Sequence, residues 1–153
     1  MMKHSCDVIA ALQGRTLVTA ESCTGGGIGA ALTDVPGSSA VYKGGIISYS
    51  NEVKISQLGV SANTLEKFGA VSEQVARQMA IGARERLGAD YAVSVTGLAG
   101  PDGDAYGNPV GTVYIGFAEA DKVAVNKYLF SGEREEIREQ AIQAALDLIL
   151  SQI

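Results

Sequence analysis

The segment Glu21-Ser22-Cys23-Thr24-Gly25-Gly26 places hydroxyl and thiol side chains beside glycines, directly after an apolar run. The run Thr16–Ala20 predicts a short buried strand, and residues 25–32 predict a helix that is opened by glycine. Open α/β sheets bind ligands at the carboxyl ends of their strands, and the free N–H groups of a helix N-terminus favour an anion. The segment is therefore either a ligand site or a glycine-rich turn in which Ser22 and Thr24 are caps.

Lys54 belongs to the segment Tyr49-Ser50-Asn51-Glu52-Val53-Lys54, which follows a second apolar run, Gly44–Tyr49. A helix that begins near Asn51 would hold Lys54 one turn inside it. Such a lysine is usually a solvated surface charge. A lysine drawn into a cleft has a lowered pKa and can act as a general base. Residue type and spacing leave both interpretations open.

Two further segments have residue types suited to anions. The stretch from Thr96 through Gly97, Ala99 and Gly100 opens a long connection, residues 96–109, whose glycines can form an anion nest or a substrate rim. Arg134 and Arg138 are four residues apart and share a helix face, where they form either ion pairs or a clamp on a phosphate or carboxylate.

Composition excludes several classes of function. The 153 residues carry a net charge of −5 without any run of Lys or Arg, which disfavours direct nucleic-acid binding. The single histidine, His4, lies near the chain start, so a usual Ser-His-Asp enzyme or zinc site is not expected. No apolar run is long enough to span a membrane, and we expect no metal and a cytoplasmic location with free cysteines.

Hydrophobic periodicity and turn residues predict eleven elements in one α/β domain, residues 1–153. Helices are predicted at 5–13, 25–32, 51–58, from Asn63 to a stop at Gly69, 73–87 with Ser72 as its cap, and 133–153. Strands are predicted at 16–20, 44–49, 91–95, 110–118 and 123–130. Helices alternate with the early strands and the last two strands form a hairpin, so we expect a mixed, mostly parallel sheet covered on both faces, with a C-terminal antiparallel hairpin.

Several of these segments together resemble one known family, the CinA C-terminal domain family. The matching stretches cover nearly the whole chain in the right order: AESCTGG (20–26), GSSAVYKGGIISYSNEVK (37–54), GAVSEQVA (69–76), DYAVSVTGLAGPDG (90–103) and NPVGTVYIGF (108–117). The resemblance implies a three-layer α/β/α sandwich. Many family members carry this domain behind a larger N-terminal domain with pyrophosphatase-type activity, and we expect neither that domain nor that activity here.

The resemblance also implies an activity, because the enzymatic members are nicotinamide mononucleotide deamidases of the PncC type. They hydrolyse the carboxamide of nicotinamide mononucleotide to nicotinate mononucleotide and ammonia, without a cofactor. Carried onto this sequence, Ser22 is the expected nucleophile and Lys54 the expected base. Backbone N–H groups near Thr24–Gly26 are expected to hold the oxyanion. The expected substrate-binding residues are Glu21, Thr24, Gly25, Gly26, Asn51, Thr96, Gly97, Ala99, Gly100, Arg134 and Arg138.

Some assignments stay open at this point. Arg138 is the first choice for the substrate phosphate and Arg134 the second. Tyr49 is a candidate catalytic residue that either orients Lys54 through its hydroxyl or fills the sheet edge. Glu21 against Lys54 would raise the lysine pKa and oppose base function. Cys23 is a rival nucleophile, although a buried small hydrophobe fits it better.

Two expectations concern the whole protein. The alternative to an enzyme is a non-catalytic, nucleotide-binding competence or damage-inducible regulatory protein. The small-molecule substrate is the expected partner, with no nucleic acid and no membrane, and an exposed hairpin edge with an apolar last helix favours a homodimer or higher homo-oligomer. Nine of the 19 glycines lie in Gly25–Gly29 and Gly97–Gly111, and we expect bulky residues at Gly25 or Gly97 to damage catalysis more than folding.

Overall fold

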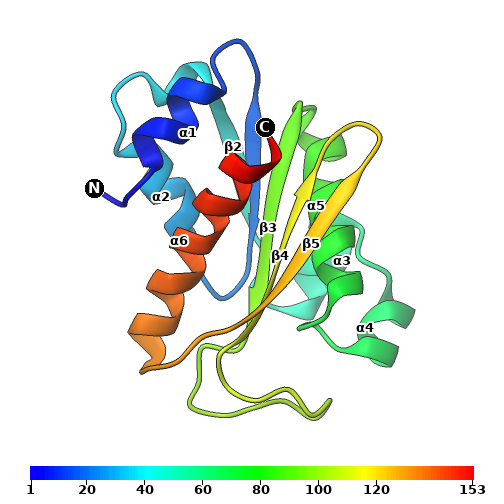
Figure 1. Ribbon diagram of the computed structural model, residues 1–153. Coiled ribbons are helices and arrows are strands. Elements are labelled where there is room, and N and C mark those ends of the chain that lie inside the picture. The colour runs from blue at the N-terminus through cyan, green and yellow to red at the C-terminus, as the bar shows by residue number, and fades with distance from the viewer.

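The computed structural model describes residues 1–153 and has a five-stranded sheet at its centre (Figure 1). The strand order is β2-β1-β3-β4-β5. The strands are β1 (Leu17–Glu21), β2 (Tyr42–Ile47), β3 (Tyr91–Gly97), β4 (Thr112–Ala118) and β5 (Val123–Leu129). Strands β2, β1 and β3 pair in parallel, whereas β4 is antiparallel to both β3 and β5. The predicted mixed sheet is confirmed, and its antiparallel part extends beyond the terminal hairpin to β3.

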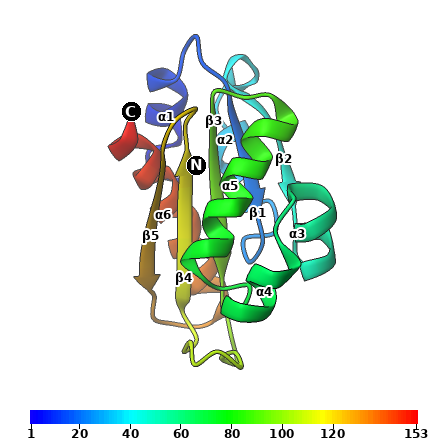
Figure 2. The ribbon, with the colours of Figure 1, turned by 90° about the vertical axis from the view of Figure 1, so that its right-hand side faces the viewer.

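Helices cover both faces of this sheet, as the predicted three-layer sandwich requires (Figures 1 and 2). One face carries α1 (Ser5–Ala11), α2 (Gly27–Thr33) and α6 (Arg134–Gln152). The other face carries α5 (Glu73–Leu87), against which α3 (Asn51–Leu58) and α4 (Ala62–Phe68) pack. A short 3-10 turn, Ser38–Ala40, precedes β2. All predicted helices and strands are present, with ends that differ by a few residues.

The helix starts show where sequence reading needed correction. Ser72 caps α5 as predicted, because its hydroxyl accepts a hydrogen bond from the Val75 N–H. Ser50 caps α3, just before the predicted start near Asn51, and Ser61 caps α4, two residues before the predicted start at Asn63. Serine and asparagine are about equally good caps, so neighbouring polar residues compete for this position and spacing alone does not choose between them.

Two apolar clusters, one on each face, hold the layers together. The first packs α1, α2 and α6 on the sheet, and the second packs α5 and its neighbours on the opposite face. All five residues of the interior strand β1 are buried, including Glu21. Lys54 also ranks among the largest fully buried side chains. Charged residues are rarely so deeply buried without a specific partner, which draws attention to these two positions.

The parallel strands end at one edge of the sheet. Glu21 at the end of β1 lies opposite Ile47 of β2 and Val95 of β3. The loop after β3 and the first turn of α6 lie at the same end of the molecule (Figure 1). The segment that follows β1, the loop after β3 and the start of α6 are thereby brought together, as expected for the carboxyl edge of parallel strands.

Two further features bear on the expected partners. None of the helices combines the length and the apolar character needed to cross a membrane. Strand β5 is at one edge of the sheet. Self-association through that edge stays a prediction.

Gly82 lets α5 approach α3 closely, and this contact yields a stability prediction. A methyl group at this helical position would overlap the carbonyl oxygen of Leu58 at the end of α3. We expect Gly82→Ala to lower the free energy of unfolding by about 2 kcal/mol, although alanine is the better helix former. Urea denaturation followed by circular dichroism measures this loss.

Gly37→Ala is the matched control for Gly82→Ala. Gly37 has a φ of 85° and no atom within 4 Å of the added methyl group. Only backbone strain should therefore act there, at a cost of about 1 kcal/mol. Equal losses in the two variants would contradict the close-approach explanation.

Candidate active site

Ser22 and Lys54 form a buried pair at the carboxyl edge of the sheet. The Nζ atom of Lys54 lies 3.1 Å from the Ser22 Oγ atom and donates a 2.7 Å hydrogen bond to the Ser48 carbonyl oxygen. Only 1% of the Lys54 surface is exposed. The surface-charge interpretation of Lys54 is therefore wrong, and the lysine is held against a serine that directly follows strand β1.

The environment of Lys54 makes its amine lose a proton more easily than an exposed lysine does. Burial lowers the pKa of Lys54 from 10.5 to about 8, because a charged ammonium is poorly stabilised away from water. A thiolate at Cys23 would oppose this effect. Burial, however, raises the pKa of Cys23 to about 11, so that thiol is neutral where Lys54 titrates. A neutral amine in contact with a serine hydroxyl can accept its proton.

A cavity of about 290 Å³ opens beside this pair. It is lined by nine of the predicted catalytic and substrate-binding residues: Ser22, Tyr49, Asn51, Lys54, Thr96, Gly97, Ala99, Gly100 and Arg134. The serine comes from the β1–α2 turn, the lysine from α3, the arginine from α6 and four residues from the end of β3 and the loop after it. A pocket with a few convergent polar groups between several elements is the usual form of a small-molecule site.

Glu21 is held away from Lys54, so the predicted possibility of an ion pair with it is wrong. The Oε1 atom of Glu21 accepts hydrogen bonds from the Thr24 hydroxyl at 2.7 Å and the Ile28 N–H at 2.9 Å. Its Oε2 atom accepts one from the Gly29 N–H at 3.0 Å. Glu21, Thr24, Gly25 and Gly26 do not line the Ser22 pocket, and they shape the turn that carries Ser22.

The two arginines have different places. The Arg138 guanidinium donates to the carbonyl oxygens of Cys23 and Thr24, at 3.0 and 3.2 Å, and does not line the pocket. Arg134 lines the pocket and donates to the Gly100 carbonyl oxygen. Arg134 is therefore the arginine that reaches the pocket, whereas Arg138 holds the Ser22 turn, and the choice between them for a substrate phosphate stays a prediction.

Tyr49 lies at the rim of the pocket and is 64% exposed. Its hydroxyl accepts a 2.9 Å hydrogen bond from Arg134 and makes none with Lys54. Neither predicted role fits this geometry, since the hydroxyl does not orient the lysine and the ring does not fill a sheet edge. Tyr49 instead places Arg134 at the rim.

Several residues that line the pocket or hold its side chains were not predicted from the sequence. Ser48 holds Lys54 through its backbone carbonyl, which any residue has. Ala70 and Val71 line the pocket from the segment between α4 and α5, and they are chemically inert side chains. Asp102 also lines it. Only Asp102 carried a chemical cue, as one of the two acidic residues, with Asp104, of the glycine-rich loop after β3.

The glycines near the pocket serve different purposes. Gly25 has a φ of 59°, a conformation that favours glycine, whereas a methyl group there would make only an ordinary 3.5 Å contact with Arg138. A side chain at Gly97 would meet Val113 and the Thr112 carbonyl oxygen of β4, at 2.6 and 3.0 Å. A side chain at Gly97 would therefore also disturb the packing of β3 against β4, and the expectation that bulky residues there damage catalysis more than folding stays a prediction.

Backbone donors are available in the Ser22 turn. The Gly25 N–H donates to the Ser22 carbonyl oxygen, whereas the N–H groups of Thr24 and Gly26 donate to no acceptor in the chain. Arg138 holds the Cys23 carbonyl, and in a trans peptide the following N–H points the opposite way. The direction of the Thr24 N–H is thus fixed, and this N–H has no acceptor within the chain.

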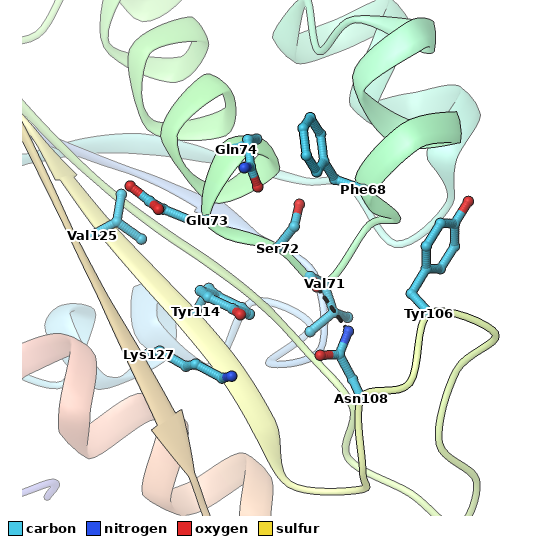
Figure 3. Close-up of a pocket in the computed structure, with 10 residues that line it drawn as sticks. All are labelled: Phe68, Val71, Ser72, Glu73, Gln74, Tyr106, Asn108, Tyr114, Val125 and Lys127. Atoms are coloured by element: carbon cyan, nitrogen blue, oxygen red, sulfur yellow. Dashed lines mark hydrogen bonds between the residues drawn. The ribbon is translucent and has the colours of Figure 1, made fainter.

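A second, larger cavity of about 420 Å³ lies between α5 and the β4–β5 pair (Figure 3). Ser72, at the start of α5, is the serine that lines this cavity. Its hydroxyl donates a hydrogen bond to the Gly69 carbonyl oxygen and accepts one from the Val75 N–H. The ammonium group that lines it, Lys127, lies at β5 (Figure 3). Without a paired nucleophile and base, this cavity is a weaker candidate than the smaller one.

The fold and site define a class of protein, an α/β sandwich with a lysine-paired serine at the carboxyl edge of its parallel strands. The family model described as the CinA C-terminal domain matches residues 2–153. The chain belongs to the CinA C-terminal domain family.

Individual relatives agree with this membership. The chain is 51% identical to nicotinamide-nucleotide amidohydrolase PncC from Enterobacter agglomerans, over 95% of this chain and 91% of that protein. It is 47% identical to a CinA-like protein from Endomicrobium trichonymphae, over 94% of this chain but 35% of that protein. The chain spans about a third of the length of several curated relatives.

Solved structures resemble the whole chain. The competence/damage inducible protein CihA from Agrobacterium tumefaciens superposes with a TM-score of 0.94 at 40% identity, covering 97% of this chain and 93% of that one.

The buried ammonium of Lys54 leads to a stability prediction. We expect Lys54→Met to raise the free energy of unfolding at pH 7 by about 1–2 kcal/mol, after the lost hydrogen bond to Ser48 is set against relief of the buried charge. The folded pKa of about 8 is below the ordinary 10.5, so wild-type stability increases as the pH rises between these values. The advantage of the variant should shrink over that range.

Urea denaturation at several pH values tests this expectation. The control is Lys67→Met at the exposed end of α4, whose effect should not change with pH. A Lys54→Met advantage that stayed constant up to about pH 10 would contradict a lowered lysine pKa.

Proposed function

We propose that the chain hydrolyses the carboxamide of nicotinamide mononucleotide to nicotinate mononucleotide and ammonia. The observation that carries this proposal is the 3.1 Å approach of the buried Lys54 Nζ atom to the Ser22 Oγ atom. The relative named nicotinamide-nucleotide amidohydrolase supports the choice of substrate, because it matches this chain over nearly its whole length.

In the proposed reaction, neutral Lys54 takes the proton of Ser22 while Oγ attacks the carboxamide carbon. The resulting oxyanion accepts hydrogen bonds from backbone N–H groups of the Ser22 turn, among them that of Thr24. Protonated Lys54 then gives its proton to the departing nitrogen, so that ammonia leaves and an acyl-enzyme remains. Water, activated by the same amine, releases nicotinate mononucleotide and restores Ser22.

The remaining pocket residues suit the mononucleotide part of this substrate. The carboxamide must lie at Ser22, at the inner end of the pocket, so the phosphate points toward the rim. Arg134 is the guanidinium of the rim and is placed by Tyr49 and Gly100. We assign Arg134 to the phosphate, since a guanidinium binds phosphate oxygens in a bidentate manner.

Removing either member of the pair should abolish turnover. We expect Ser22→Ala and Lys54→Ala each to reduce ammonia release from nicotinamide mononucleotide by at least about 10³-fold, because the pair acts as a unit. A coupled ammonia assay with mass spectrometry of the product measures this, and circular dichroism checks folding. Full activity in Ser22→Ala would rule out the nucleophile, and tight nucleotide binding without turnover in the wild type would favour the regulatory alternative.

The activity should increase with pH through the titration of Lys54. Because the neutral amine is the reactive form and the pKa of Lys54 is about 8, kcat/KM should rise about tenfold per pH unit below that value and level off above it. Steady-state rates in a constant-ionic-strength buffer series give the profile. A flat profile between about pH 6 and pH 9 would contradict a lysine base.

A further inference from the structure

Glu21 stands out because its buried carboxylate is completely engaged yet makes no ion pair. Its surface is 1% exposed. The donors are the Thr24 hydroxyl and the N–H groups of Ile28 and Gly29, at 2.7, 2.9 and 3.0 Å. All three donors belong to the turn and first helical residues that follow Ser22. The buried carboxylate therefore fixes the conformation of the turn that carries Ser22.

The backbone of the same residue is linked to the lysine. The Glu21 carbonyl oxygen accepts hydrogen bonds from the Ser48 N–H at 2.7 Å and the Ser48 hydroxyl at 3.2 Å. The Ser48 carbonyl oxygen in turn accepts the 2.7 Å hydrogen bond from Lys54. One residue thus fixes the turn that carries the nucleophile and, through Ser48, the acceptor that holds the base.

We propose that Glu21 is a positioning residue, whose carboxylate sets the Ser22 hydroxyl within reach of Lys54 without touching the substrate. This proposal rests on the proposed amidohydrolase function. Glu21 does not line the Ser22 pocket, which separates it from the residues that contact a ligand there.

Glutamine is the informative substitution because it keeps the size of the side chain. It offers one carbonyl oxygen where the carboxylate has two acceptor oxygens. The NH₂ group of glutamine would face either the Gly29 N–H or the groups that now donate to Oε1. Two hydrogen-bond donors facing each other cannot form a hydrogen bond. The turn must then shift by a fraction of an ångström. Small misplacements of a reacting group lower the rate steeply, by on the order of 10²-fold for about 1 Å.

The expected result separates positioning from charge effects. Burial lowers the pKa of Lys54, and the charge of Glu21 does not contribute to that shift. Glu21→Gln should therefore lower kcat by at least about tenfold, leave KM nearly unchanged, and leave the midpoint of the pH–rate profile in place. Thr24→Val removes one donor to the same carboxylate and should lower kcat in the same way, while the double variant should lose less than the product of both effects.

Matched controls are Glu73→Gln, an exposed carboxylate paired with Arg77 on α5, and Thr33→Val at the exposed end of α2. Both should retain wild-type kcat. Rates are expressed per folded molecule, from circular dichroism and active-site titration. An unchanged kcat in Glu21→Gln would overturn the proposal, as would a loss confined to KM or a displaced pH midpoint.

A second readout does not depend on the substrate. A fluorophosphonate probe acylates activated serines in general, so its labelling rate at Ser22, located by peptide mass spectrometry, reports on the pair itself. Glu21→Gln should label at least about tenfold more slowly than wild type or Glu73→Gln. If wild type is labelled but releases no ammonia from nicotinamide mononucleotide, the proposed substrate fails and this rate ratio still decides the role of Glu21. Equal labelling rates, or no labelling of wild type, would overturn the proposal.

Discussion

The burial of the Lys54 amine is the constraint on which the rest of the site depends. An ammonium group removed from water is unfavourable, and the protein offers it no carboxylate partner, only the Ser48 carbonyl oxygen and the Ser22 hydroxyl. This unfavourable free energy of the buried charge is removed when the amine loses its proton. Burial therefore destabilises the folded protein, and it also lowers the lysine pKa so that Lys54 is a candidate base near neutral pH.

The packing around α3 explains how that burial is maintained. Ser50 caps α3, so the lysine sits in the first turn, and Gly82 lets the far end of the helix lie close against α5. The serine comes from the opposite direction, on a turn held by the Glu21 carboxylate inside and by Arg138 outside. Two elements from different faces of the sheet thus meet at one point. Neither can move without separating nucleophile from base.

Sequence patterns were sufficient for the layers but not for the interior of the site. Apolar periodicity located every helix and strand, because burial on one or two faces leaves a direct trace in residue type. Burial of Lys54 leaves no such trace, since its residue type favours the surface; its spacing left a surface charge and a buried base both open, and the resemblance favoured the base. Arg134 and Arg138 share one helix face, and a single turn of about 5.4 Å decides which reaches the pocket. That difference depends on tertiary placement, which spacing does not specify.

The choice between Ser22 and Cys23 as nucleophile follows from the same geometry. Both residues line the pocket, and a thiol is ordinarily the more acidic group. Here burial raises the pKa of Cys23 to about 11, above that of Lys54, and Lys54 makes its side-chain hydrogen bond to the hydroxyl of Ser22 rather than to the thiol. Arg138 also fixes the Cys23 carbonyl, and with it the direction of the Thr24 N–H. The cysteine therefore supplies backbone geometry and apolar packing, and in the proposed mechanism the serine beside it carries the reaction.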